Sequence, residues 1–332
     1  MDSRLPGAGG YHVRRSEVRS RAASAPLHCS VSGVGRRCRL ISTYVRRLRL
    51  ATELLTLRQD RQMSSDALAR AVGLPRTTVS RLENARMRPD PNDVMKLLEH
   101  LGVTGDAWTN LMTIARQASE RGWWESAVGG GARQALYANL EAGASAIREY
   151  QMTLLPGLLQ TPEYTEARAS VDRADWSAHF NPERAVEART GRQRVLHRPD
   201  GPAYEVVIDE LAVRRPAVAD DVLRKQLISI AHQCESNSKI TARVLPVDGR
   251  IAGHLVPRSG FSIYTYPDPL DPVVVAVDTV TDDLVLTKPD AVSHYLNLYE
   301  RLRDAALSAE HSVRFLLDAA DKIHNLATGR IA

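Results

Sequence analysis

The sequence is short of cysteine and has no long apolar run. Its 332 residues include three cysteines, Cys29, Cys38 and Cys234, and no two of them form a Cys-x-x-Cys pair. This pattern excludes a disulfide framework and a cysteine zinc site, and a reducing cytoplasm is the expected setting. No stretch of about 18 consecutive apolar residues is present, so we expect no membrane-spanning helix. The first residues also lack the apolar stretch of a signal peptide.

The motifs of common enzyme classes are missing as well. The sequence contains no Gly-x-Ser-x-Gly, His-Glu-x-x-His or Gly-x-x-x-x-Gly-Lys-Ser/Thr motif, and no Gly-x-Gly-x-x-Gly motif follows a strand pattern. The ten histidines are dispersed without the spacing of metal ligands. We therefore expect no catalytic activity, no bound metal and no cofactor.

Residues 1–90 contain no lysine, but they are rich in arginine. They hold 18 arginines against seven acidic side chains, a net charge of +11, whereas the whole chain is +5 and residues 91–332 are therefore −6. A basic region binds polyanions such as nucleic acids through counterion release, and an acidic region is repelled by them. The charge split predicts that the first part of the chain binds a polyanion and that the remainder faces away from it.

Residues 68–82 read Leu-Ala-Arg-Ala-Val-Gly-Leu-Pro-Arg-Thr-Thr-Val-Ser-Arg-Leu, which is the spacing that two short helices crossing at a tight turn require. Ala69 is small where the helices approach each other, and Gly73 supplies the positive φ expected at the turn. Val79 and Leu82 recur at i and i+3 and are expected to bury one face of the second helix. The pattern predicts a helix-turn-helix.

Apolar residues at helical spacing continue on both sides of this segment. They are Leu50, Leu54 and Leu57 upstream, then Val94, Leu97, Leu98 and Leu101, and finally Trp108, Leu111, Met112 and Ala115. Together these stripes predict an all-α, five-helix domain over residues 44–120. Residues 1–43 show no sustained period and are predicted to be a disordered basic extension.

The outward face of the second helix carries the side chains that contact DNA bases in a major groove. The predicted base-reading residues are Arg76, Thr77, Ser80 and Arg81. The predicted phosphate-contacting residues, which flank that face, are Ser64, Thr78, Arg86 and Arg88. The alternative is a helical hairpin that packs but touches no nucleic acid.

Residues 44–101 resemble the Xre/Cro/C1-type helix-turn-helix family. The residues that carry the resemblance are Ser64, Leu68-Ala69, Gly73, the run from 77 to 84, and Arg88-Pro89. It implies a transcriptional regulator that binds a double-stranded DNA operator, most simply as a homodimer on a two-fold site. Two positions depart from the family pattern. Pro75 replaces the usual Ser or Thr N-cap, and Ala85 replaces a common Gly, which is unfavourable if that loop is left-handed.

The rest of the chain mixes helix and strand patterns. Strands are predicted at 204–208, 240–245, 261–266 and 273–277, where Val, Ile and aromatic residues lie between Pro, Gly or Asp. Helices are predicted at 140–150, 221–235, 291–306 and 312–326, and another begins near residue 162. We expect residues 121–332 to form an α+β domain with a mostly antiparallel sheet.

This region also resembles a known domain, the C-terminal domain of actinobacterial antitoxin-like transcriptional regulators. The matching segments are residues 155–164, 189–193, 209–210, 244–246 and 260–261. The resemblance implies a protein ligand, a small partner encoded by a neighbouring gene. Asp278 departs from the pattern, because a Glu often ends this late strand.

Polar residues near the predicted strand ends form a candidate effector pocket. They are Arg192, Gln193, Asp209 and Glu210, with His254 as a further member, although ion pairs of purely structural role are the alternative. Two functions stay open. One is a regulator whose C-terminal domain receives a partner protein or small effector, and the other is an antitoxin-like module that binds a small toxin-like partner and autoregulates its operon. A third class, an enzyme with a DNA-binding appendage, requires a cleft with a convergent nucleophile and base.

Overall fold

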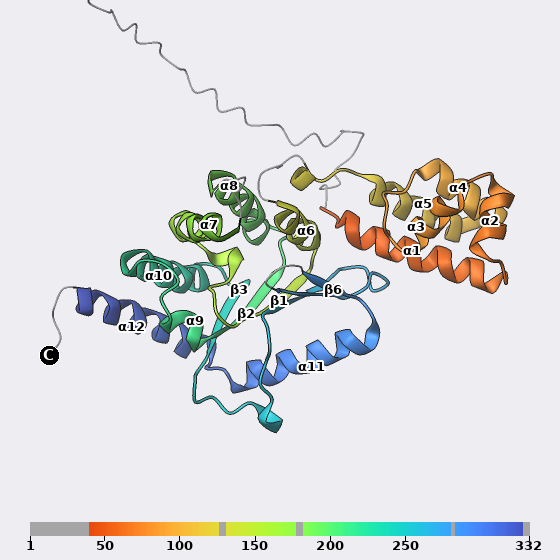
Figure 1. Cartoon of the computed structure of the whole chain (residues 1–332). Coiled ribbons are helices and arrows are strands. Elements are labelled where there is room, and N and C mark those ends of the chain that lie inside the picture. The colour runs from red at the N-terminus through yellow and green to blue at the C-terminus, as the bar shows by residue number, and fades with distance from the viewer. Residues whose placement is uncertain (1–39, 126–130, 177–181, 280–282, 328–332) are drawn as a thin grey trace, which may run out of the picture. The chain divides into compact units, whose positions relative to one another are not determined.

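The computed structural model describes residues 40–125, 131–176, 182–279 and 283–327 (Figure 1). Residues 1–39 of the predicted basic extension lie outside the described residues. Within these ranges, no helix combines the length and the hydropathy that a membrane span requires.

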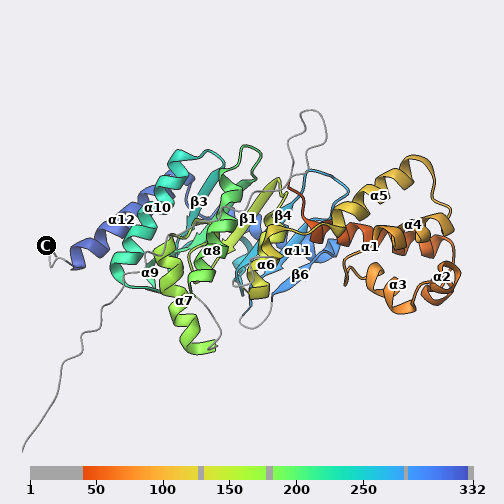
Figure 2. The same ribbon diagram turned by 90° about the horizontal axis from the view of Figure 1, so that it is seen from above.

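The first described part consists of five helices, as predicted. They are α1 (Thr43–Asp60), α2 (Ser65–Val72), α3 (Arg76–Glu83), α4 (Pro91–His100) and α5 (Gly105–Ser119). Helix α1 runs along α5 and contacts α3 (Figure 2). The predicted apolar stripes form one core, with Leu50, Leu68, Val79 and Leu97 among its buried members.

Side-chain caps and one glycine define the ends of these helices. The Ser64 side chain accepts a hydrogen bond from the Ala67 amide at the start of α2. Helix α2 ends at Gly73, whose φ of 68° is the left-handed conformation predicted for the turn. Pro75 precedes α3 without making a side-chain cap. Ala85 has a φ of 54°, so the residue that replaces glycine in the loop after α3 is left-handed.

The second part alternates helices with six described strands. Its elements are η1 (Trp123–Glu125), α6 (Gly131–Glu141), β1 (Ala146–Gln151), η2 (Gly157–Leu159), α7 (Pro162–Trp176), α8 (Pro182–Gln193), η3 (Arg194–His197), β2 (Ala203–Asp209), α9 (Glu210–Arg214), α10 (Asp220–Ser236), β3 (Ile240–Leu245), η4 (Ala252–His254), β4 (Phe261–Thr265), β5 (Val274–Val277), β6 (Leu284–Leu286), α11 (Pro289–Ala305) and α12 (Ala309–Ala327).

The six strands form one sheet in the order β3-β2-β1-β4-β5-β6. The pairs β1–β2 and β2–β3 are parallel, whereas β1–β4, β4–β5 and β5–β6 are antiparallel. The fold is therefore the predicted helical domain followed by an α+β domain with a mostly antiparallel sheet. The parallel pairs follow from the helical crossovers through α7 and α8 and through α9 and α10, because parallel neighbours need long connections.

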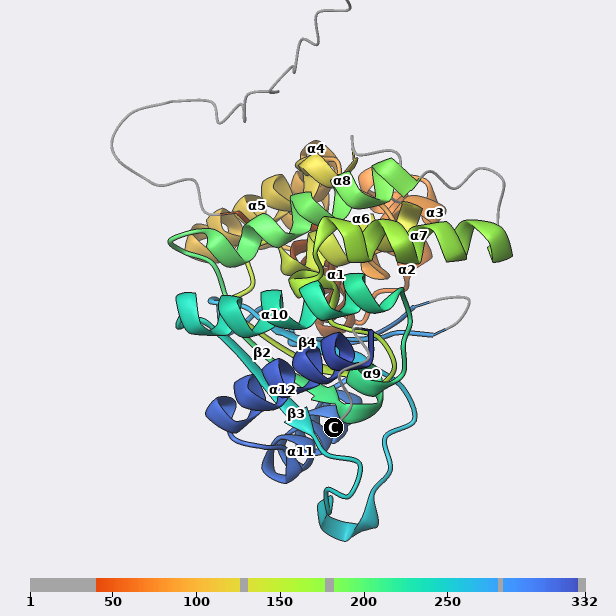
Figure 3. The same ribbon diagram turned by 90° about the vertical axis from the view of Figure 1, so that its left-hand side faces the viewer.

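Helices cover both faces of this sheet (Figures 1 and 3). Side chains of α6, α7 and α10 pack on one face, where Tyr204 and Val206 of β2 are fully buried. Helix α11 packs on the other face against Val207 and Phe261. Val206 and Val207 belong to different cores, because successive side chains of a β-strand point to opposite faces of the sheet. Strand β2 is therefore buried on both faces.

Strand β3 lies at one edge of the sheet, and the segment between α11 and α12 covers its outer side. The Leu307 amide donates to the Val244 carbonyl at 2.8 Å, and the Val244 amide donates to the Ser312 hydroxyl at 2.9 Å. Helix α12 then packs beside α10, with Leu316 and Ala320 buried.

One predicted helix is wrong after its first two residues. Residues 140–150 were expected to be helical, but α6 ends at Glu141 and β1 begins at Ala146. Strand β1 is central, between β2 and β4, and both of its faces contact helices. A strand buried on both faces loses the polar and apolar alternation that would distinguish it from a helix. The four predicted strands and the helices corresponding to α7, α10, α11 and α12 are confirmed, whereas β6, α8 and α9 were not predicted.

Helix α1 contributes to the cores of both parts. Val45 lies in the core of the α+β domain, while Leu50 and Leu54 lie in the helical core. Just before the helix, the buried Ser42 hydroxyl donates to the Asn139 side chain of α6 at 3.0 Å. The two domains therefore share one continuous helix.

Candidate nucleic-acid interface

Helix α3 presents a polar face to solvent and an apolar face to the core. Val79 and Leu82 are 1% and 4% exposed and anchor the helix. The four predicted base-reading side chains are all exposed: Arg76, Thr77, Ser80 and Arg81. At 3.6 residues per turn, these positions share one outward face. The structure thus brings together the residues that the sequence assigns to base contacts.

Arg76 has a partner on the preceding helix. Its Nε lies 2.6 Å from the Asp66 carboxylate, and both side chains are at least half exposed. An ion pair this exposed adds little to stability. Its effect is to orient the Arg76 side chain at the start of α3.

The predicted phosphate contacts differ in their surroundings. The Ser64 oxygen caps α2, and its hydroxyl proton stays available for a donor bond. Arg86 is exposed in the loop after α3, whereas Thr78 is half-buried. Arg88 is engaged, because its Nη2 donates to Glu125 of η1 at 2.6 Å. Arg88 must exchange that carboxylate for a phosphate before it can contact DNA.

A second ion pair fixes the end of α3, and sequence reasoning did not find it. Arg58 of α1 donates from Nε and Nη2 to the two carboxylate oxygens of Glu83, at 2.6 Å and 3.1 Å. The Ser65 hydroxyl donates to the same carboxylate at 3.2 Å. Glu83 is only 6% exposed, so α1, α2 and α3 meet at one buried charge. The sequence signal was Glu83 itself, a charged residue beside the buried Leu82.

The residues of the candidate effector pocket do not converge. Arg192 donates to Glu141 of α6, and both side chains are buried. Gln193 donates to the carbonyls of Gly157 and Gln160. These contacts tie α8 to its neighbours in the core, which is the structural alternative considered for these residues.

Asp209 and Glu210 lie elsewhere, at the end of β2. Asp209 caps α9 by accepting from the Leu211 amide, and it accepts from the Tyr150 hydroxyl at 3.0 Å. Glu210 pairs with Arg214 and accepts from the Val247 amide. No hydrogen bond or ion pair in the described part of the chain links this pair to Arg192 or Gln193. His254 lies in η4 and is exposed.

A cavity of about 100 Å³ lies instead beside the start of α1. Its lining includes Ser42, Val45, Arg46, Tyr266, Asp268 and Asp271. None of the four candidate effector residues lines it. Within the described ranges, no group of three or more His, Cys, Asp or Glu side chains is arranged to hold a metal ion.

Two family models match the chain. Residues 49–110 match a helix-turn-helix domain, which contains α2 and α3 and indicates a DNA-binding regulator. Residues 134–318 match a domain of unknown function (DUF5753), which spans the sheet and most of its helices. No curated protein and no solved structure matches the chain. The chain therefore belongs to the DUF5753 family, and it carries a helix-turn-helix domain ahead of the family's defining domain.

Proposed function

We propose that this chain is a sequence-specific transcriptional regulator that binds a two-fold DNA operator as a homodimer of the Xre type. The observation that carries the proposal is the exposed polar row on α3, backed by buried Val79 and Leu82. Arginine donates to two acceptors of guanine in the major groove, and hydroxyl side chains form hydrogen bonds with the base edges there. Arg76 and Arg81 are the strongest candidates for guanine contacts.

Phosphate contacts would fix the orientation of α3 in the groove. Ser64 at the start of α2 and Arg86 in the loop after α3 lie on either side of that helix in the sequence, and both are exposed. Contacts before and after the reading helix set its register without reading sequence. Thr78 and, once released from Glu125, Arg88 complete the proposed set.

The C-terminal domain is proposed to receive a partner protein or a small effector in the cytoplasm, without catalysis. Residues 91–332, which include this domain and the last two helices of the helical domain, carry a net charge of −6, which opposes contact with phosphates. The shared helix α1 supplies a physical connection between an event in this domain and the helix-turn-helix.

An antitoxin-like role is the second candidate. The loop between β3 and β4 carries Val247 and Val256, which are 84% and 79% exposed. A protein ligand that covers these valines would remove their apolar surface from water, which favours binding. In this version the C-terminal domain binds a small toxin-like protein encoded by the neighbouring gene, and DNA binding autoregulates the operon.

Selection from a random duplex library with the full chain tests DNA reading. Wild type should enrich one two-fold site, and Arg81→Ala should lose the preference at one base pair of each half-site. Arg314→Ala is the control, because Arg314 is exposed on α12 and pairs with Glu310. Failure of the wild-type chain to enrich any site contradicts the proposal.

Co-purification with the neighbouring gene's small protein then separates the two candidates. A complex that blocks the activity of that protein favours the antitoxin-like role. A complex that changes only operator occupancy favours the regulator.

A further inference from the structure

Helix α1 is fastened to a loop of the α+β domain by two arginines. Arg46 and Arg49 lie one turn apart and face the segment between β4 and β5. That segment, residues 267–272, reads Pro-Asp-Pro-Leu-Asp-Pro and is called here the proline-framed loop.

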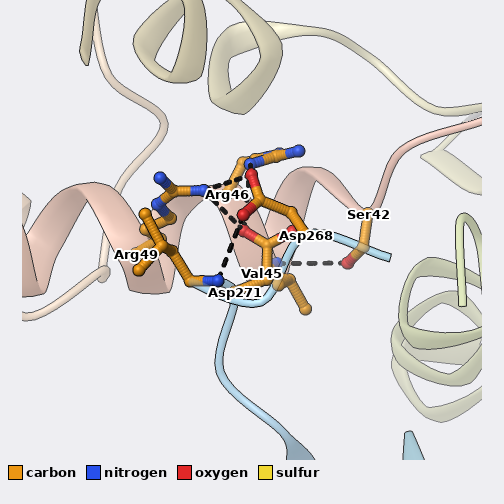
Figure 4. Close-up of polar contacts among 7 residues, drawn as sticks. Ser42, Val45, Arg46, Arg49, Asp268 and Asp271 are labelled. Carbon is orange, nitrogen blue, oxygen red and sulfur yellow. Dashed lines mark hydrogen bonds and ion pairs between the residues drawn. The ribbon is translucent and has the colours of Figure 1, made fainter. Parts of the chain in front are cut away.

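The four charges form a closed cluster (Figure 4). Arg46 Nη1 lies 3.3 Å from Asp268 and 3.0 Å from Asp271. Arg49 Nη1 lies 2.5 Å from Asp268 and 3.5 Å from Asp271. Each arginine therefore contacts both aspartates, and the removal of one side chain affects two ion pairs.

The proline-framed loop is built to be stiff. Proline fixes φ at three of its six positions. The Leu270 amide donates to the Asp268 side chain at 3.1 Å, and the Asp271 amide donates to the Asp268 carbonyl at 3.0 Å. A loop held in this way presents its two carboxylates at fixed positions.

Burial of these charged side chains costs free energy, because it removes them from water. Arg49 is 9% exposed and Asp271 is 5% exposed. Burial raises the pKa of Asp271 in spite of the nearby Arg46. Burial also acts to raise the pKa of Asp268, but hydrogen bonds from the Leu270 amide and the two arginines outweigh it and lower that pKa. Buried ion pairs are weak evidence of stability, and in some proteins they fix one arrangement of the elements that they join.

The other end of α1 holds α3 through the Arg58–Glu83 ion pair described above. Arg58 also donates to the Met63 carbonyl at 2.6 Å, which fixes its position at the turn before α2. Between Arg49 and Arg58 the sequence of α1 contains no Gly or Pro, the usual causes of kinks. These arginines are nine positions apart, which is about 14 Å along the helix axis, so the two ion-pair groups do not touch.

We propose that α1 is a rigid connector through which the proline-framed loop sets the position of α3, so that a partner or effector that shifts this loop changes DNA affinity. The inference rests on the proposed DNA-binding function and adds the route of its regulation. Its physical basis is a single helix with an ion-pair group, called here a clamp, near each end. One clamp joins α1 to Asp268 and Asp271 of the α+β domain, and the other joins α1 to Glu83 of α3.

A double-mutant cycle in the full chain tests this connector. Asp271→Asn loosens one clamp, Glu83→Gln loosens the other, and affinity is measured for the duplex that the wild-type chain selects. Sites this far apart normally act independently. The connector predicts that the double variant departs from the product of the single effects by about threefold or more.

A matched control uses Asp93→Asn in place of Glu83→Gln. Asp93 is also a paired carboxylate of the helical domain, but its partner is Lys96 on the same helix α4. Its effect on affinity should multiply with that of Asp271→Asn. If the effects on DNA affinity multiply for both pairs of substitutions, the inference is overturned. The proposed DNA-binding function is not affected by that result.

Hydrogen exchange gives a readout that does not need DNA. In Asp268→Asn/Asp271→Asn, amides of α3 should exchange about threefold faster or more, while those of β2 keep their protection. Unchanged exchange in α3 overturns the inference. If the double variant fails to fold, Arg49→Lys, which keeps the charge, replaces it in the same measurement. If the wild-type chain selects no DNA, only the proposed function is refuted. Hydrogen exchange of the α3 amides still tests whether α1 connects the loop to α3.

Discussion

Arg88 donates hydrogen bonds from one nitrogen to both carboxylate oxygens of Glu125, at 2.6 Å and 2.5 Å. Both side chains are about one third exposed, so the pair contributes little to stability. Its importance lies in the charge of the partner. A carboxylate has the same sign as a phosphate, and Glu125 therefore competes with DNA for Arg88.

Glu125→Gln should tighten DNA binding, because it releases the Arg88 guanidinium to bind a phosphate. The dependence of log affinity on log salt should steepen by about 0.9, the increment expected for one additional neutralised phosphate. A salt titration of binding to the selected duplex measures both effects. Glu310→Gln, which breaks an exposed pair on α12, is the control and should change neither. If Glu125→Gln alters neither the affinity nor the slope, Glu125 does not compete with DNA for Arg88.

Arg81→Ala should reduce affinity for the selected site by about 1–3 kcal/mol and relax selectivity at one base pair. Arg86→Ala should instead lower affinity for all sequences and flatten the salt slope by about 1. Both arginines are exposed, so neither change should unfold the domain. Binding to the selected and to a scrambled duplex separates the two roles. An equal loss on both duplexes for Arg81→Ala would remove it from the base-reading set.

Ala85→Gly should stabilise the helical domain by about 1 kcal/mol, because an L-residue is strained at a φ of 54° and glycine is not. Gly73→Ala makes the reverse change at another left-handed position, and it should destabilise the helical domain by a similar amount. A methyl group at Gly73 meets no atom within 4 Å, so only its φ of 68° opposes the change. Urea denaturation of both variants measures the two effects. If Ala85→Gly is destabilising, the loop after α3 is not left-handed.

Glu149→Gln should alter the pH dependence of stability. Glu149 is buried in the sheet, and burial raises its pKa, although Tyr204 and Gln151 each donate to it at 2.6 Å. A carboxyl whose folded pKa is raised contributes stability below its ordinary value of 4.5, and that contribution is lost as pH rises through the folded value.

Ionisation of Glu149 should therefore lower the wild-type melting temperature as the pH rises above 4.5, and Glu149→Gln should remove this decrease. Glu163→Gln on the exposed start of α7 is the control and should retain the wild-type profile. The interpretation fails if the profiles of Glu149→Gln and wild type coincide.

The sequence predicted the helical domain well because its signals are local. Ser64 caps a helix, Gly73 ends it, and Val79 with Leu82 repeats at helical spacing, so each feature is visible within a few residues. Strand β1 was missed because its identity depends on distant partners. Its neighbours β2 and β4 begin more than 50 residues later, and no local pattern reveals burial on both faces.

The candidate site shows the same division. The polar face of α3 follows from helical periodicity, and the structure places all four predicted base-reading residues on it. The pairing of Arg88 with Glu125 joins residues 37 positions apart, beyond any periodic signal. Asp209 and Glu210 were grouped with Arg192 because all three are polar and lie near predicted strand ends. In the fold, Asp209 caps α9, whereas Arg192 neutralises Glu141.

The cover over strand β3 has a consequence for how the chain behaves at high concentration. Val244 has its amide and carbonyl satisfied by Ser312 and Leu307, so this edge of the sheet does not offer those groups to another chain. Exposed sheet edges recruit strands from other molecules and seed insoluble assemblies. Loss of the residues from Leu307 onward would strip this protection. Helix α12 therefore reduces the tendency of this sheet edge to aggregate, in addition to packing in the core.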